Sequence, residues 1–140
     1  MDLQLKIDHA PEPSDTGFLL ARLIEYNTQK TNVPNGRELA IFIRDAKRAI
    51  AAGIYGGTWG GWLEIFYLWV REDTRGMGIG SRLLLTAEHE AIARGCHHSL
   101  VETYDFQAPG FYGKLGYQVF CVLDGMPDKQ TRFYLKKKLV

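Results

Sequence analysis

Hydrophobic and polar positions alternate along several short stretches of the chain, and this period of two is typical of half-buried β-strands. The first such stretch is residues 2–8 (DLQLKID), which predicts an N-terminal strand. Short polar, proline or glycine turns separate the later stretches from one another. Those stretches predict six more strands, over residues 38–45, 48–59, 62–70, 98–104, 117–123 and 131–139.

Three helices are predicted between these strands. The first is expected over about residues 16–29, where Ser14 and Asp15 can cap its start. Its apolar side consists of Phe18, Leu19, Leu23 and Tyr26. A second helix follows the glycine-rich residues 76–80 and ends at Gly95, and a short third helix ends at Gly116.

The predicted order of elements is β-α-β-β-β-α-β-α-β-β, which is that of a layered α/β fold with a mixed sheet. A helix connects the strand over 62–70 to the strand over 98–104, so these two strands are expected to be parallel. The chain has no internal repeat, low-complexity segment or linker-like stretch. Residues 1–140 are therefore expected to form a single domain.

Composition narrows the class of protein without naming a function. The 140 residues carry a formal net charge of +1, so charge gives no reason to expect binding to nucleic acid. No signal-like segment or membrane-length apolar run is present, and two cysteines are too few for a disulfide framework. A soluble cytoplasmic protein without membrane contact is expected. The adjacent Cys96, His97 and His98 lack a second spaced pair, so no metal site is predicted.

The glycine-rich loop is the strongest chemical signal in the sequence. Residues 75–80 (RGMGIG) lie between a predicted strand and a predicted helix, where backbone N–H groups can bind a phosphate. A Walker loop would need a lysine after the glycines, and none follows. A dinucleotide fingerprint would need a glycine at position 81 or 83, where Ser81 and Leu83 stand. A glycine-rich turn without a ligand is the remaining alternative.

The R-x-x-G-x-G arrangement resembles the acetyl-coenzyme-A loop of the GNAT acetyltransferase superfamily. A second segment, YDFQAPGFYGKLGYQVF, is similar to the signature of small bacterial members, in which an FY-x-K-x-G-(F/Y) helix follows the next strand. The two signatures together cover residues 62–120. The resemblance implies an α/β fold with a mixed, mostly antiparallel twisted sheet, flanked by helices and with a parallel pair of strands around the acetyl-CoA loop.

The resemblance also implies a site for acetyl-CoA as co-substrate. In the family, the loop amides and the free N–H groups of the following helix hold the pyrophosphate of coenzyme A. The strand before the loop pairs its main chain with the pantetheine arm and the thioester carbonyl. The residues implied here are Leu68, Trp69, Val70, Arg75, Gly76, Met77, Gly78, Ile79, Gly80 and Ser81.

Two side chains are candidates for catalysis. Tyr112 matches the family tyrosine that donates a proton to the departing thiolate, a role that a phenol with a pKa of about 10 can fill. Its alternative is an aromatic core residue. Glu64 lies six residues before Val70, where some members carry a glutamate general base, and burial in this apolar strand would raise its pKa. A solvent-facing Glu64, with a water chain as base, is the alternative.

The activity that the resemblance implies is transfer of an acetyl group from acetyl-CoA to a primary amine, by direct transfer in a ternary complex. A small-molecule amine is the expected acceptor. Glu102 and Asp105 could attract it, and the aromatic residues between positions 55 and 69 could line its pocket. A protein lysine or N-terminal acetyltransferase and a non-catalytic acyl-CoA-binding domain are the alternatives. Family members are often dimers, so a homodimer also stays open.

Overall fold

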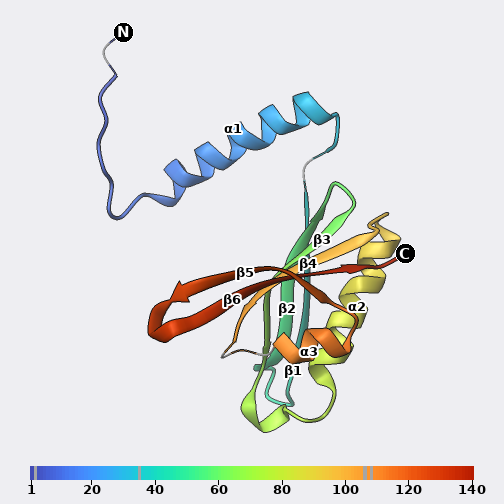
Figure 1. Cartoon of the computed structure of the whole chain (residues 1–140). Helices are drawn as coiled ribbons and strands as arrows, with labels where there is room; N and C mark the ends of the chain where they lie inside the picture. Colours follow the sequence, from blue (N-terminus) through green and yellow to red (C-terminus); the bar gives the residue numbers. More distant parts are fainter. Residues whose placement is uncertain (2, 35, 106, 108) are drawn as a thin grey trace. The chain divides into compact units, whose positions relative to one another are not determined.

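The structure is a computed structural model that describes residues 1, 3–34, 36–105, 107 and 109–140 (Figure 1). Contacts within the chain group it into two units, Met1–Asn35 and Gly36–Val140. Each unit is described by itself below. The single domain expected over residues 1–140 stays a prediction.

The first unit contains one helix and no strand among its described residues. Residues 3–8 form no strand, so the strand predicted over 2–8 is wrong over the described residues, and residue 2 lies outside them. Alternation alone does not make a strand, because a strand also needs a neighbour with which to exchange backbone hydrogen bonds. The side chains of Leu3, Leu5 and Ile7 are exposed.

Helix α1 spans Pro13–Thr31, which confirms the first predicted helix with wider bounds. The predicted caps are wrong, because Ser14 and Asp15 lie inside the helix and Glu12 precedes it without a side-chain cap. Proline at the first helical position explains the earlier start, since its fixed φ suits a helix and it has no N–H to satisfy. The helix ends at Thr31 and is followed by Asn32, which adopts a left-handed conformation with a φ of 58°.

The second unit is built on one six-stranded sheet with the order β1-β2-β3-β4-β6-β5. The strands are β1 (Arg37–Arg44), β2 (Ile50–Trp59), β3 (Trp62–Val70), β4 (His98–Tyr104), β5 (Gln118–Met126) and β6 (Gln130–Lys138). All neighbours are antiparallel except β3 and β4, which are parallel as predicted. The mixed, mostly antiparallel sheet expected from the sequence is therefore confirmed.

Short helical segments connect the later strands: η1 (Glu72–Thr74), α2 (Ile79–Ala93), α3 (Pro109–Lys114) and η2 (Pro127–Lys129). Helix α2 joins β3 to β4 and lies along one face of the sheet (Figure 1). The core is formed between α2 and that face. Its buried members include Leu83, Leu84, Ala87 and Ala91 from α2, together with Ala52, Ile54, Leu63 and Ile65 from β2 and β3.

A buried polar network attaches α2 to the two strands β4 and β6. Glu88 on α2 is only 4% exposed, and its carboxylate accepts hydrogen bonds from the Tyr117 hydroxyl at 3.0 Å and from Lys137 Nζ at 2.7 Å. The Tyr117 hydroxyl also lies 2.8 Å from Ser99 Oγ on β4. Buried polar groups are tolerated when they are hydrogen-bonded in this way. The network therefore fixes the position of α2 without interrupting the core.

Candidate active site

Strands β3 and β4 separate halfway along β3. Their parallel register ends at the pair Ile65–Val101. The register between β2 and β3 shifts immediately afterwards, opposite Gly56, and leaves Phe66 as an extra residue in β3. A bulge of this kind bends a strand and increases its twist. The second half of β3 therefore leaves β4, and the backbone groups on that edge have no partner strand among the described residues.

Gly56 is what allows β2 to follow β3 through this bulge. A Cβ atom on Gly56 would overlap the carbonyl oxygen of Glu64 and would lie 3.2 Å from Cα of Ile65. Both obstacles are backbone atoms, which cannot rotate away as a flexible side chain would. Only glycine fits at this position, so the bend in β3 depends on it.

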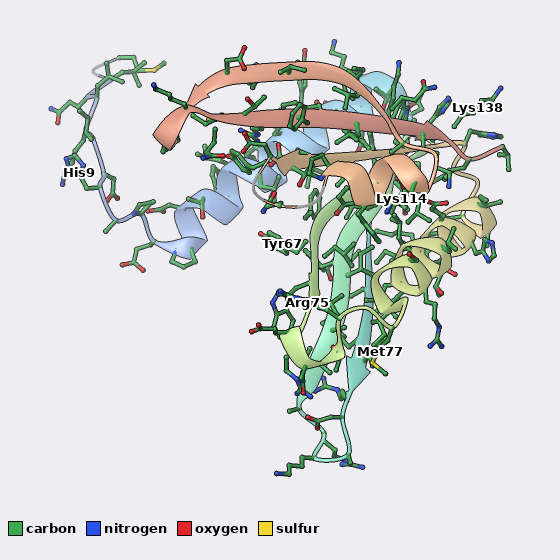
Figure 2. All side chains as sticks on the ribbon, turned by 60° about the horizontal axis from the view of Figure 1, so that its bottom comes forward. His9, Tyr67, Arg75, Met77, Lys114 and Lys138 are labelled. Carbon is green, nitrogen blue, oxygen red and sulfur yellow. The ribbon has the colours of Figure 1, made fainter. Side chains whose placement is uncertain are left out.

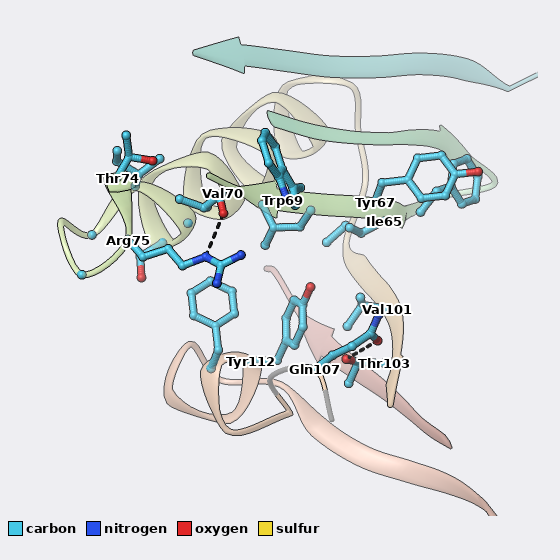
Figure 3. Close-up of a pocket in the computed structure, with 18 of the residues that line it drawn as sticks. Ile65, Tyr67, Trp69, Val70, Thr74, Arg75, Val101, Thr103, Gln107 and Tyr112 are labelled. Carbon is cyan, nitrogen blue, oxygen red and sulfur yellow. Dashed lines mark hydrogen bonds between the residues drawn. The ribbon is translucent and has the colours of Figure 1, made fainter. Parts of the chain in front are cut away.

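A cavity of about 770 Å³ occupies the gap between the separated strands (Figure 3). Its walls come from the second half of β3, the glycine loop, the start of α2, the end of β4 and the short helix α3. A volume of this size is in the range of small-molecule and cofactor sites. The cavity therefore brings both sequence signatures to one place.

The three glycines of the loop serve two different purposes. Gly76 and Gly78 adopt φ values of 77° and 74°, in the left-handed region that other residues rarely enter. Gly80 has no such φ, but a Cβ atom on it would lie 3.3 Å from the Phe111 ring of α3. Two glycines therefore shape the turn, and the third permits close contact between the loop and α3.

The loop presents a row of free backbone donors. Within the described part of the chain, the N–H groups of residues 76–81 donate to no protein acceptor. The first paired N–H group of α2 is that of Arg82, which donates to the carbonyl of Gly78 at 3.1 Å. Unpaired N–H groups and the positive end of the helix dipole favour an anion. Met77 is exposed at the turn of this loop (Figure 2).

Arginine side chains hold the start of the loop. Arg71 pairs with Asp73 at 2.6 Å and with Asp45 in the β1–β2 connection at 2.8 Å. Hydrogen bonds from the Arg71 guanidinium lower the pKa of both carboxyl groups. Arg75 Nε donates to the carbonyl of Val70 at 2.9 Å, which returns the loop to the end of β3 (Figure 3). The start of the loop is therefore fixed to the end of β3 and to the β1–β2 connection.

Tyr112 lies across the cavity from the end of β3. Its side chain is 7% exposed, and Figure 3 shows the hydroxyl pointing from α3 toward β3. The ring packs edge-to-face against Phe111 and Tyr117, with centroids 5.1 and 5.8 Å away. Burial raises the pKa of Tyr112 to about 12, because it disfavours the phenolate. The phenol therefore stays protonated at neutral pH and can donate its proton.

Most of the implied acetyl-CoA residues line this one cavity. The lining includes Leu68, Trp69, Val70, Arg75, Gly76, Gly78, Ile79, Gly80 and Ser81, together with Tyr112. Met77 belongs to the loop but does not line the cavity, because its side chain is exposed. Glu64 also lies outside this cavity: it is exposed on β3 and lines two smaller neighbouring cavities. The burial of Glu64 that was considered from the sequence is therefore absent. The roles of these residues stay predictions.

Several further residues that shape the cavity were assigned no role from the sequence, although Gln107 and Phe111 lie within the second signature segment. Thr103, Gln107 and Phe111 line it as well. Gln107 Oε1 accepts hydrogen bonds from Thr103 Oγ1 at 3.0 Å and from the Tyr104 N–H at 2.8 Å. These bonds hold the Gln107 side chain against the end of β4 (Figure 3). Gly56, which permits the bulge, lay in the run GIYGGTW, whose paired glycines could have indicated a break in the strand.

Comparison with known proteins decides the family. The model of the acetyltransferase (GNAT) family matches residues 6–117, which is most of the chain. This chain belongs to the GNAT acetyltransferase family. A blasticidin-S acetyltransferase from Streptomyces morookaense is 38% identical over 115 residues, which cover 79% of this chain and 85% of the relative. An acetyltransferase from Agrobacterium fabrum is 33% identical over 116 residues, or 83% and 85% of the two chains.

Solved structures agree with the assignment of the fold. The crystal structure of a putative acetyltransferase from Agrobacterium tumefaciens matches with a TM-score of 0.91 at 28% identity and covers 97% of this chain and 99% of the other. An aminoglycoside 6′-N-acetyltransferase, solved with coenzyme A, has a TM-score of 0.65 at 20% identity and covers 74% and 73%. The second likeness concerns the fold alone.

The GNAT assignment makes the protein an acetyltransferase with acetyl-CoA as its co-substrate. The backbone groups around the cavity also fit acetyl-CoA, independently of the family assignment. It offers unpaired N–H groups in the loop, as a pyrophosphate requires, and an unpaired strand edge on β3, along which the amide groups of a pantetheine arm can bond. No helix in the described part of the chain is long and apolar enough to cross a membrane.

Proposed function

We propose that this GNAT enzyme acetylates a primary amine of a small molecule, by direct transfer while acetyl-CoA and the amine are both bound. The observation that carries the proposal is the position of the Tyr112 hydroxyl, which faces the unpaired half of β3 inside the 770 Å³ cavity. A thioester held along that strand edge would have a proton donor beside its sulfur. The anion-binding loop would fix the far end of the donor molecule.

The donor would be held mainly by main-chain groups. The N–H groups of residues 76–81 are the proposed pyrophosphate ligands, and Arg75 adds positive charge beside them. Leu68, Trp69 and Val70 offer the strand edge for the pantetheine arm. A strand N–H that points at the thioester carbonyl would stabilise the negative charge that develops there. Backbone recognition of this type tolerates many side chains but few changes of conformation.

The proposed reaction conserves atoms and charge. An acceptor ammonium first loses a proton, and the neutral nitrogen then attacks the thioester carbon. As the new N–C bond forms and the C–S bond breaks, sulfur takes the proton of Tyr112 and leaves as a thiol. The second proton on nitrogen restores the phenol. The net reaction yields an acetamide, free coenzyme A and one proton, and Glu64 or a water chain is the proposed base for the first step.

The test is a screen of acceptors with acetyl-CoA, in which release of free thiol is measured. The panel contains small primary amines, polyamines, aminated antibiotics, peptides with a free lysine and peptides with a free N-terminus. Blasticidin S is included because the Streptomyces morookaense relative is named for it. We expect kcat/KM to be at least about tenfold higher for small amines than for peptides. This ratio corresponds to about 1.4 kcal/mol of transition-state stabilisation.

Each alternative has its own outcome in the same experiment. Faster turnover with peptides would support a protein acetyltransferase and overturn the proposed acceptor. A large thermal shift with coenzyme A and no thiol release with any amine would support a non-catalytic binding domain. The absence of any thermal shift would contradict the proposed donor site itself.

A further inference from the structure

A small second cavity meets the donor cavity at the point where β3 and β4 separate. It has a volume of about 230 Å³ and shares with the donor cavity the lining residues Ile65, Phe66, Tyr67, Val101 and Glu102. Side chains of a strand point alternately to its two faces, so Glu64 lies on the face opposite to the buried Leu63 and Ile65. The second cavity is therefore reached from the face of the sheet that α2 does not cover.

A longer groove extends this second cavity across the sheet. Its volume is about 460 Å³, and it shares Glu64, Phe66 and Leu100 with the second cavity. We call it the aromatic groove, because four of its lining residues are Tyr55, Trp59, Trp62 and Phe66. The donor cavity, the second cavity and the aromatic groove thus adjoin one another in series through shared lining residues, and we call this series the path.

Trp59, Trp62 and Phe66 of the aromatic groove are exposed and Tyr55 is half-buried, and all of these rings except Trp59 pack against another ring. Tyr55 packs against Phe66 with centroids 5.8 Å apart, and its hydroxyl donates to Glu38 at 2.7 Å. Trp62 stacks on His98 of β4 at 4.6 Å. Phe66 lies above Gly57, where a Cβ atom would be 3.9 Å from the ring. Fixed rings with exposed surfaces can stack on a flat ligand with little loss of side-chain entropy.

Glu64 is the carboxylate at the junction of the second cavity and the aromatic groove. Among the described residues it makes no hydrogen bond or ion pair. The neighbouring carboxylates are engaged: Glu38 by the Tyr55 hydroxyl, and Glu102 by Arg132. Negative charge that can still bind a cation is therefore concentrated at one point of the path, next to the opening into the donor cavity.

We propose that the acceptor binds along this path and is a primary ammonium carried by a planar ring, with the ammonium on Glu64 and the ring in the aromatic groove. This inference rests on the proposed function. A cation near a carboxylate and aromatic faces gains from both charge and cation–π attraction. The nitrogen would then stand beside the gap that begins beyond the last paired residues, Ile65 and Val101, and would reach the thioester through that gap. Donor and acceptor would enter from opposite faces of the sheet.

The first experiment compares 2-phenylethylamine with 2-cyclohexylethylamine, which have the same carbon count and the same amine. The phenyl compound is expected to have a kcat/KM at least about fivefold higher, because stacking on aromatic faces adds to its binding. Greater hydrophobicity would favour the cyclohexyl compound, so it cannot produce this result. Turnover of both amines at equal kcat/KM would overturn the inference and leave the proposed function intact. No turnover with any amine would contradict the proposed function instead.

Variants of the aromatic groove locate the preference. Trp59→Leu and Phe66→Leu are expected to reduce the phenyl-to-cyclohexyl ratio toward one, with the KM for acetyl-CoA unchanged in Trp59→Leu. Phe120→Leu on β5 is the matched control, because Phe120 is 50% exposed, Phe66 is 48% exposed, and Phe120 lines none of the three cavities. An unchanged ratio in both groove variants would contradict the inference.

Charge at Glu64 is tested separately with two inhibitors, the cation trimethyl(2-phenylethyl)ammonium and the neutral 2-phenylethanol. Glu64→Gln is expected to weaken inhibition by the cation at least about fivefold, since an ion pair is lost, and to leave inhibition by the alcohol unchanged. Equal changes for the two inhibitors, or none for either, would exclude Glu64 as the group that binds the ammonium.

Discussion

A Cβ atom on Gly56 would overlap the carbonyl oxygen of Glu64, so the bulge in β3 can form only if residue 56 has no side chain. The bulge lies where the register between β3 and β4 ends, and the donor cavity begins beyond it. A glycine on the neighbouring strand therefore determines whether the cavity exists, although it does not line the cavity.

Gly56→Ala is expected to lower the free energy of unfolding by about 3 kcal/mol and to raise the KM for acetyl-CoA, because β2 and β3 must move apart. Gly57→Ala is the matched control: its Cβ would meet Arg37 O at an ordinary 3.4 Å, and the expected change is below about 1 kcal/mol. Urea unfolding and steady-state kinetics measure both effects. Equal stability of the two variants would argue against the assigned role of Gly56.

Removal of two buried hydroxyl groups should separate catalysis from stability. Tyr112→Phe is expected to lower kcat about 10²-fold or more, with little change in stability, because its hydroxyl faces the cavity. Tyr117→Phe is the matched control: its hydroxyl bonds to Glu88, so the loss should be about 1–2 kcal/mol of stability with kcat per folded molecule retained. A normal kcat in Tyr112→Phe would exclude it as the proton donor.

The raised pKa of Tyr112 predicts a loss of stability at alkaline pH. The unfolded chain releases this proton at the ordinary pKa of 10.0, whereas the folded protein keeps it until about pH 12. Stability is therefore complete below pH 10 and decreases between pH 10 and 12, by about 2.7 kcal/mol from this group at 1.36 kcal/mol per pH unit. Urea unfolding at a series of pH values measures the slope, which Tyr112→Phe should reduce.

Gly78 and Gly80 have different structural roles in the loop, so a second substitution at Phe111 should rescue an alanine variant of Gly80 but not one of Gly78. Gly80→Ala should raise the KM for acetyl-CoA about fivefold because its methyl group presses on the Phe111 ring, and Phe111→Leu in the same chain should recover most of the loss. Gly78→Ala strains a backbone φ of 74°, and no neighbouring side chain can relieve that strain. Recovery of Gly78→Ala by Phe111→Leu would contradict this distinction.

The sequence predicted most of the second unit because its elements have strong local patterns. The strand over 98–104 and the parallel pairing of β3 with β4 were predicted correctly, since a helix connects those two strands. Residues 3–8 have an equally clear alternation but form no strand. Alternation records only which side chains could share a face, whereas a strand also requires a partner, and the partner is a property of the whole fold.

The candidate site was predictable where it depends on backbone conformation. Glycines at positive φ, such as Gly76 and Gly78, leave a visible mark in a sequence. The bulge at Phe66 left only the paired glycines Gly56 and Gly57 on the neighbouring strand, and these do not locate it, because it depends on an extra residue in the pairing between two strands. The burial of Glu88 was equally unpredictable from the sequence, because a glutamate on a helix suggests a surface position. Its burial depends on hydrogen bonds with Lys137 and Tyr117, which lie far from it along the chain.

The separation of β3 from β4 also has a consequence for the timing of the reaction. If the two substrates reach the opening from opposite faces of the sheet, neither obstructs the route of the other. Initial-rate plots should then intersect, and each product should inhibit chiefly against its own substrate, as in a mechanism without a compulsory order. Coenzyme A could depart while the acetylated product is still bound, and the next donor could enter before the product has left.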